Sequence, residues 1–131
     1  MLRRSAKSPF MPSSLVFPGG RLDPADGDAS DDASWERAGL RECAEEAGLR
    51  LEDRSLRWFD TWLTPSAESR RRYLARFFVT ELGAGEGEHA EADGHETHDG
   101  RWATAAAHLR AWEAEEVDLP PPTVAVLLRL R

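Results

Sequence analysis

Residues 41–49 read Arg41-Glu42-Cys43-Ala44-Glu45-Glu46-Ala47-Gly48-Leu49, and this stretch is the most informative part of the sequence. On a helix, Glu42, Glu45 and Glu46 stand at positions i, i+3 and i+4, so their carboxylates share one face. Like charges at this spacing destabilise a helix by about 0.2–0.5 kcal/mol per pair, and a local cost of this kind indicates function. Clustered hard oxygen ligands are what Mg²⁺ prefers in proteins. Arg41, one turn before Glu45, can orient a carboxylate through its planar guanidinium.

The sequence around this stretch predicts a helix over residues 35–47. Ser34 is the expected N-cap residue, and Gly48 stands where a C-cap glycine belongs. Cys43 occupies an apolar position of the helix with no evident base beside it, which favours core packing over a role as nucleophile. A solvated acidic face is the alternative interpretation of the glutamates, and the glutamates alone do not decide between the two.

Short strands and further helices are expected outside this helix. The predicted strands cover residues 15–17, 56–64, 73–82 and 101–103. The predicted helices run from an N-cap at Thr104 to Trp112 and over residues 123–130. Residues 65–72 are expected to form a turn, and residues 83–100 a polar loop.

The overall composition is that of a single globular domain over residues 1–131. Its net charge of −7 makes nucleic-acid or membrane-surface binding a poor expectation, because both partners are negatively charged. The basic residues at 3 and 4 are not followed by the apolar stretch that a signal peptide would have, and no apolar run approaches roughly 18 residues, the length of a membrane span. The single cysteine excludes an internal disulfide. We therefore expect a cytoplasmic protein with no nucleic-acid and no membrane partner.

The stretch at 41–49 resembles the Nudix signature G-x5-E-x7-R-E-U-x-E-E-x-G-U, in which U is apolar. Every specified position from the arginine onward is filled, and Gly19-Gly20, after Phe17-Pro18, supplies the glycine start. The resemblance implies an α/β fold, an α/β/α sandwich with a mixed sheet. It also implies Mg²⁺- or Mn²⁺-dependent hydrolysis of a diphosphate linkage in a nucleotide metabolite.

The loop between the glycines and the helix departs from this signature. Arg41 follows Gly20 by twenty-one positions, where the family pattern has fourteen. The loop glutamate of the pattern is missing, since Asp26 and Ala33 occupy its two alternative positions. Asp26 and Glu36 are the candidates to replace it. An insertion in this loop is similar to the branch that includes peroxisomal coenzyme A diphosphatases.

The resemblance assigns roles to particular residues. The carbonyl of Gly19 and the carboxylates of Glu42, Glu45 and Glu46 would hold the metal ions, and Arg41 would orient the glutamates. Glu42 would position or deprotonate the attacking water, with Glu96, from the polar loop, as the other candidate base. Three histidines of that loop lack the paired ligand spacing of a zinc site, so a polar loop is the favoured interpretation; they are His89, His95 and His98.

The expected substrate is coenzyme A or an acyl derivative. Coenzyme A-type Nudix enzymes have a longer motif that ends in Phe-Pro-Gly-Gly. When it is aligned on Phe17-Pro18-Gly19-Gly20, Arg4-Ser5 fall at its Arg-Ser positions. Arg71, Arg72 and Arg76 offer positive charge for its 3′-phosphate, although a solvated turn explains them equally well. ADP-ribose or a reduced dinucleotide such as NADH is the alternative substrate. A catalytically silent Nudix-fold binding domain is the alternative of a different class.

The beginning of the chain gives one further expectation. Residues 2–5, which precede the glycine loop closely, look like the tail of a longer strand, so we expect the N-terminal strand to be truncated. A sheet edge left open in this way would favour association, which makes a homodimer an expected alternative to a monomer.

Overall fold

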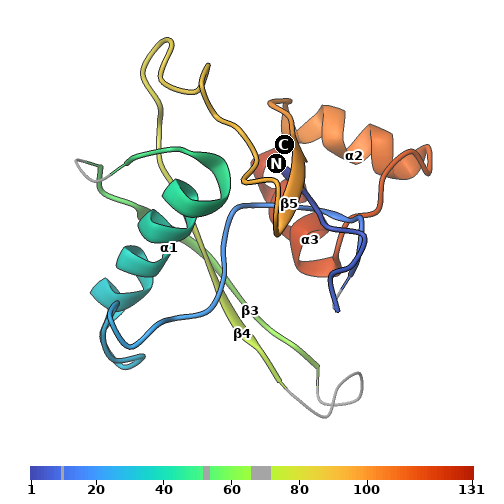
Figure 1. Ribbon diagram of the computed structural model, residues 1–131. Helices are drawn as coiled ribbons and strands as arrows, with labels where there is room; N and C mark the ends of the chain where they lie inside the picture. Colours follow the sequence, from blue (N-terminus) through green and yellow to red (C-terminus); the bar gives the residue numbers. More distant parts are fainter. Residues whose placement is uncertain (10, 52–53, 66–71) are drawn as a thin grey trace.

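The computed structural model describes residues 1–9, 11–51, 54–65 and 72–131 (Figure 1). Its strands are β1 (Leu2–Arg4), β2 (Leu15–Val16), β3 (Arg57–Leu63), β4 (Leu74–Val79) and β5 (Thr97–Gly100). Its helices are α1 (Asp32–Ala47), α2 (Ala105–Glu113) and α3 (Pro121–Leu130). The expected α/β class is confirmed.

The strands pair in antiparallel fashion and form two sheets. One sheet has the order β2-β1-β5, and the other consists of β3 and β4. The single mixed sheet of the sequence prediction is therefore replaced, among the described residues, by two antiparallel ones. The strand predicted at residues 101–103 is wrong in position. The chain pairs with β1 at Thr97–Gly100 instead. Arg101 extends that pairing to Met1, because its amide donates to the Met1 carbonyl at 2.9 Å and its carbonyl accepts from the Met1 amino group at 2.8 Å.

Helix α1 begins three residues before the predicted start. Its N-cap is Asp31, whose carboxylate accepts from the Ala33 amide and from the Ser34 hydroxyl. A carboxylate here is also favoured by the positive end of the helix dipole. Ser34 is consequently a fully buried residue of the first turn and not the cap. The C-cap prediction is confirmed, because Gly48 has a φ of 64°, and its amide donates to the Cys43 carbonyl.

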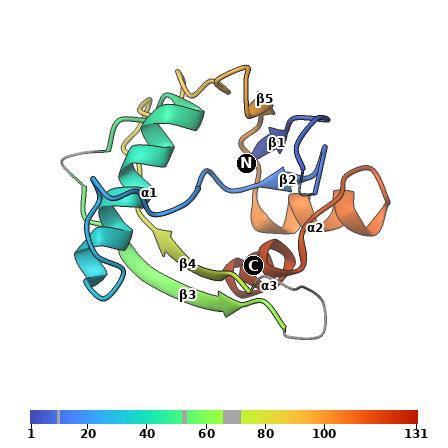
Figure 2. The same ribbon diagram turned by 60° about the horizontal axis from the view of Figure 1, so that its bottom comes forward.

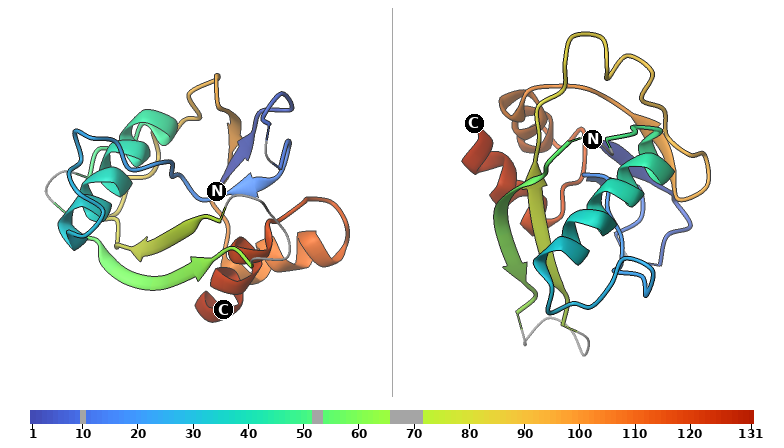
Figure 3. Two further views of the ribbon diagram at one scale, coloured as in Figure 1. Left: turned by 90° about the horizontal axis from the view of Figure 1, so that it is seen from below. Right: turned by 90° about the vertical axis from the view of Figure 1, so that its left-hand side faces the viewer.

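The β3–β4 hairpin separates α1 from the C-terminal helices. Arg76 of β4 lies on the Trp35 ring of α1, 4.7 Å from its centroid, whereas the next residue, Phe77, contacts Phe17 edge to face. Consecutive strand residues point to opposite faces of a sheet, so these contacts lie on opposite sides. Arg129 of α3 pairs with β3 (Asp60, 2.6 Å). In Figure 2, α1 and α3 lie near opposite ends of the hairpin, and the right-hand view of Figure 3 shows them on different sides of it.

The main hydrophobic core lies between the N-terminal sheet and the two C-terminal helices. Thr104 caps α2 as predicted, by accepting from the Ala107 amide. The buried cluster consists of Leu15, Leu109, Ala111, Val117, Leu119 and Leu127. Phe17 packs against this cluster, so the residue that leads into Pro18-Gly19-Gly20 is anchored in the core. The core thereby fixes one end of the glycine loop beside α1.

Candidate functional site

The glycine loop and the acidic face of α1 lie against each other. The Gly19 amide donates to Glu46 Oε2 at 2.8 Å, across 27 positions of sequence. Gly20 lies so close to Glu42 that a Cβ atom would be 2.2 Å from Glu42 Oε1, a distance at which the carboxylate would have to move. A side chain at position 20 would therefore displace Glu42. The structure thus brings Gly19, Glu42 and Glu46 together, as the sequence predicts.

The guanidinium of Arg41 links the carboxylates of this site. Its Nη1 donates to Glu42 Oε1 at 2.9 Å and to Glu45 Oε2 at 2.8 Å. Its Nη2 donates to Asp26 Oδ2 at 2.9 Å and to the carbonyl of Arg21 at 2.9 Å. The long loop after the glycines therefore returns to α1 and meets the same arginine as two of the glutamates.

Asp26 is the loop carboxylate that meets Arg41. It is buried, and its hydrogen bonds from Arg41 hold the pKa of its carboxyl below the ordinary value. Glu36, the other candidate of the sequence analysis, is not among the partners of Arg41. The spacing in sequence leaves both candidates open, and in the structure Asp26 is the one that meets Arg41.

Burial and mutual repulsion perturb the two inner glutamates. Burial raises the pKa of Glu46 to about 7, against the amide of Gly19 and with further repulsion from Glu42 and Glu96. Burial also raises the pKa of Glu42, although its hydrogen bond from Arg41 opposes the shift. The site therefore disfavours the ionised forms of Glu42 and Glu46, and a positive charge bound nearby would favour them.

Glu96 reaches the site through a turn fixed to the end of α1. The Asp93 amide donates to the carbonyl of Glu46 at 3.2 Å, and the Thr97 hydroxyl oxygen lies 3.3 Å from the same carbonyl. The charge of Glu96 contributes to the raised pKa of both Glu42 and Glu46. The structure thus places the predicted Glu96 near the acidic face.

The residues that hold this turn were not among the predicted site residues. Asp93 stands four residues before Thr97 in the polar loop, and a short Asp side chain that caps its own turn is the signal that could have identified it.

The predicted substrate arginines lie in different places. Arg4, at the end of β1, donates to the Ser8 hydroxyl, and the next amide, of Ser5, donates to the carbonyl of Glu96 at 2.8 Å. Arg72 is exposed and donates to the carbonyl of Thr64, the residue that follows β3. Arg71 lies outside the described residues.

Arg76 lies at the other end of α1 from the inner glutamates. It pairs with Asp32 and lies on the Trp35 ring. Glu42 and Glu46 follow Asp32 by ten and fourteen residues, which is about 15–21 Å along a helix. Arg76 therefore supports the first turn of the helix and does not adjoin the carboxylates.

The donor set of the site suits a hard divalent cation. Among the described residues no group of three or more His, Cys, Asp or Glu is already gathered closely enough to hold a metal, and Arg41 hydrogen-bonds two of the glutamates. The oxygens present are nevertheless those that Mg²⁺ takes, and two of the carboxyl groups have raised pKa values that a cation would lower. The donor oxygens of these residues therefore fit a magnesium or manganese ion, since the carboxylate that Arg41 holds at Glu45 Oε2 has a second oxygen.

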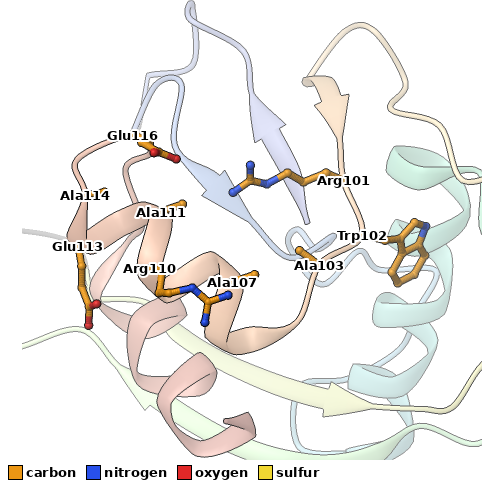
Figure 4. Close-up of a pocket in the computed structure, with 9 residues that line it drawn as sticks. All are labelled: Arg101, Trp102, Ala103, Ala107, Arg110, Ala111, Glu113, Ala114 and Glu116. Carbon is orange, nitrogen blue, oxygen red and sulfur yellow. The ribbon is translucent and has the colours of Figure 1, made fainter.

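A separate groove of about 790 Å³ lies over α2 (Figure 4). It is bordered by Arg101 and Arg110 and, at the other end, by Glu113 and Glu116, with alanines between them. Trp102, whose indole N–H donates to the carbonyl of Gly87 at 2.9 Å, forms part of its edge. None of the predicted site residues lines this groove, so the candidate chemistry belongs to the open acidic face of α1.

Comparison with known proteins gives one finding. A family model described as the NUDIX domain matches residues 1–127. No curated protein and no solved structure matches the chain. In the described part of the chain, none of the helices has the length and apolar character needed to cross a bilayer. The chain belongs to the Nudix family, whose hydrolases cut pyrophosphate bonds in small nucleotide substrates and generally use divalent metal ions such as Mg²⁺.

Proposed function

We propose that this protein is an active Mg²⁺- or Mn²⁺-dependent diphosphatase whose preferred substrate is coenzyme A or an acyl-coenzyme A. The observation that carries the enzymatic part is the facing arrangement of Glu42, Glu45 and Glu46, linked by Arg41 and packed against the glycine loop. A silent binding domain has no need of carboxylates whose ionised forms are disfavoured by burial and by one another.

In this proposal the metal ligands are the carbonyl of Gly19 and the carboxylates of Glu42, Glu45 and Glu46. The bound ion supplies positive charge that offsets the charge of the diphosphate and makes a nearby water more acidic. Arg41 keeps Glu42 and Glu45 oriented, and Asp26 holds Arg41 from the other side.

The attacking water needs a base. A water molecule attacks one phosphorus in line, its proton passes to a carboxylate, and the bond from that phosphorus to the bridging oxygen breaks. Glu42 is one candidate base, because its carboxylate lies on the acidic face of α1 against the glycine loop, where the attacking water would stand. Glu96 is the other, since it is exposed and its charge reaches both inner glutamates.

Two features support coenzyme A as the substrate. The spacing from Arg4-Ser5 to the glycine loop is similar to that of the coenzyme A-type Nudix motif, and the long loop after Gly20 is similar to that branch. Of the four candidate arginines, Arg4 is joined to the Glu96 turn by the neighbouring Ser5 amide. Its guanidinium has a hydroxyl partner, Ser8, but no carboxylate partner in the described chain, so its positive charge is available to a phosphate.

A hydrolysis screen tests the enzymatic part. The chain is assayed with Mg²⁺ and with Mn²⁺ against coenzyme A, ADP-ribose, NADH and other nucleotide diphosphates. Glu45→Gln and Glu46→Gln should abolish turnover while the fold is kept, and Glu36→Gln on the same helix is the matched control. Retention of most of the activity by both variants would show that the assigned site is wrong, and an inactive wild-type chain would favour the silent domain.

A substrate pair tests the coenzyme A part. If Arg4 contacts the 3′-phosphate, kcat/KM should be about tenfold or more lower for dephospho-coenzyme A, the size of one charged hydrogen bond. Arg4→Ala should remove that difference, whereas Arg76→Ala should leave it unchanged, because Arg76 lies at the far end of α1. Equal rates on both substrates, or a clear preference for ADP-ribose, would contradict coenzyme A and leave the diphosphatase assignment intact.

A further inference from the structure

The carboxylate of Asp93 organises the turn that carries Glu96. Its Oδ1 accepts from the amides of His95 and Thr97, at 3.0 and 2.9 Å, and from the Thr97 hydroxyl at 3.1 Å. Its Oδ2 accepts from the Glu96 amide at 3.3 Å. One side chain therefore satisfies four donors within five residues, which defines the path of the backbone through position 96.

The same turn is tied to the C-terminal end of α1. Thr97 is 1% exposed, and its hydroxyl lies between Asp93 Oδ1 and the carbonyl of Glu46. The Asp93 amide donates to that carbonyl as well, and the Glu91 amide donates to the carbonyl of Ala47 at 3.0 Å. Carbonyls in the last turn of a helix lack partners within the helix, so the loop supplies them.

The N-terminal sheet holds the other side of the turn. The Ser5 amide donates to the carbonyl of Glu96 at 2.8 Å, and Arg4 is the register partner of Thr97 across β1 and β5. The backbone of Glu96 is thus bonded on both sides while its side chain remains exposed.

We propose that Asp93 is a positioning residue, which folds the 93–97 turn so that Glu96 is held beside Glu42 and Glu46. Its location has a cost, because a further carboxylate stands next to a site that already gathers negative charge. A neutral residue at this position would avoid the repulsion. Asp93 offsets it with the four hydrogen bonds that its carboxylate accepts. The proposal rests on the proposed function in one respect, namely that Glu96 takes part in hydrolysis.

Two substitutions separate the hydrogen bonds of Asp93 from its charge. Asp93→Asn keeps an oxygen at Oδ1, and with it three of the four bonds, whereas Asp93→Ala removes them all. Glu91→Ala is the matched control, because its exposed carboxylate makes no hydrogen bond or ion pair within the part of the chain that the structure describes. If Asp93→Ala fails to fold, Asp93→Asn still carries the test.

Amide hydrogen exchange of the full chain measures the turn without reference to activity. Asp93→Ala should speed exchange of the Glu96 and Thr97 amides by about tenfold or more, since each loses an acceptor. Asp93→Asn should speed exchange at Glu96 more than at Thr97, because only the Oδ2 acceptor is replaced by a donor. Unchanged exchange in both variants would overturn the proposal, whatever the enzyme does.

A double-mutant cycle with Glu96→Gln measures the effect on the reaction. Asp93→Ala should lower kcat and leave KM within about twofold, and it should cause no further loss in the Glu96→Gln background. Fully additive losses, or an unaffected Glu96→Gln enzyme, would overturn the positioning role while hydrolysis itself stands. If the wild-type chain hydrolyses no substrate, the proposed function fails, and the exchange measurement alone decides whether Asp93 holds the turn.

Discussion

Replacement of Glu46 by glutamine should make the metal-free protein more stable at neutral and alkaline pH. Glu46 is 7% exposed, and its Oε2 accepts from the Gly19 amide. Glutamine keeps an oxygen acceptor for that amide and nearly the same volume. The substitution therefore removes the buried charge and little else.

The magnitude follows from the pKa of Glu46. Burial raises this pKa from the ordinary glutamate value of 4.5 to about 7, so the folded state binds this proton more tightly than the unfolded state does. As the pH rises from 4.5 to about 7, the carboxyl ionises in the unfolded state before it ionises in the folded state. The free energy of unfolding therefore falls over this range. One pKa unit is about 1.4 kcal/mol, so the loss between about pH 5 and pH 8 is about 2–3 kcal/mol in the wild type.

Urea denaturation of the chelator-treated proteins at both pH values gives the comparison. His108, whose pKa burial lowers, changes stability in the opposite direction over part of this range, but it is present in both proteins and cancels. At about pH 8 the variant should be about 2 kcal/mol more stable than the wild type. Added Mg²⁺ should stabilise the wild type by mass action and the variant much less. Parallel pH dependences in the two proteins would refute the reasoning.

Three other substitutions have separate expected outcomes. Gly20→Ala should displace the Glu42 carboxylate, so kcat should fall severely while the urea midpoint stays close to that of the wild type; normal turnover would contradict this geometry. Arg41→Lys should lower kcat/KM by about tenfold or more, because one ammonium cannot replace the planar fork that meets Asp26 and two glutamates; a kcat/KM equal to that of the wild type would argue against the orienting role. Gly48→Ala should cost about 1 kcal/mol of unfolding free energy in the same denaturation assay, since φ is +64° there; an unchanged midpoint would exclude strain at this cap.

The sequence predicts the local features of α1 because these depend on spacing along one helix. Positions 42, 45 and 46 share a face through helical periodicity alone, and Gly48 ends the helix because it adopts the left-handed conformation readily. The start of the helix was misplaced by three residues, since Asp31, Asp32 and Ser34 are all acceptable caps by residue type. Tertiary packing buries Ser34 and leaves Asp31 to cap the helix.

The acidic helix, its glycine loop and the family to which they belong can be predicted from the sequence alone, because each depends on a short, contiguous pattern of residues. Only the tertiary structure decides which distant residues meet that helix. It selects Asp26 over Glu36 as the partner of Arg41, brings Asp93 and Glu96 to the end of α1, and places Arg76 at the opposite end. These contacts depend on how loops return across tens of residues, and no local spacing fixes such a path. The physical reason is that loop closure is decided by packing and hydrogen bonding of the whole domain, not by the preferences of the segments it joins.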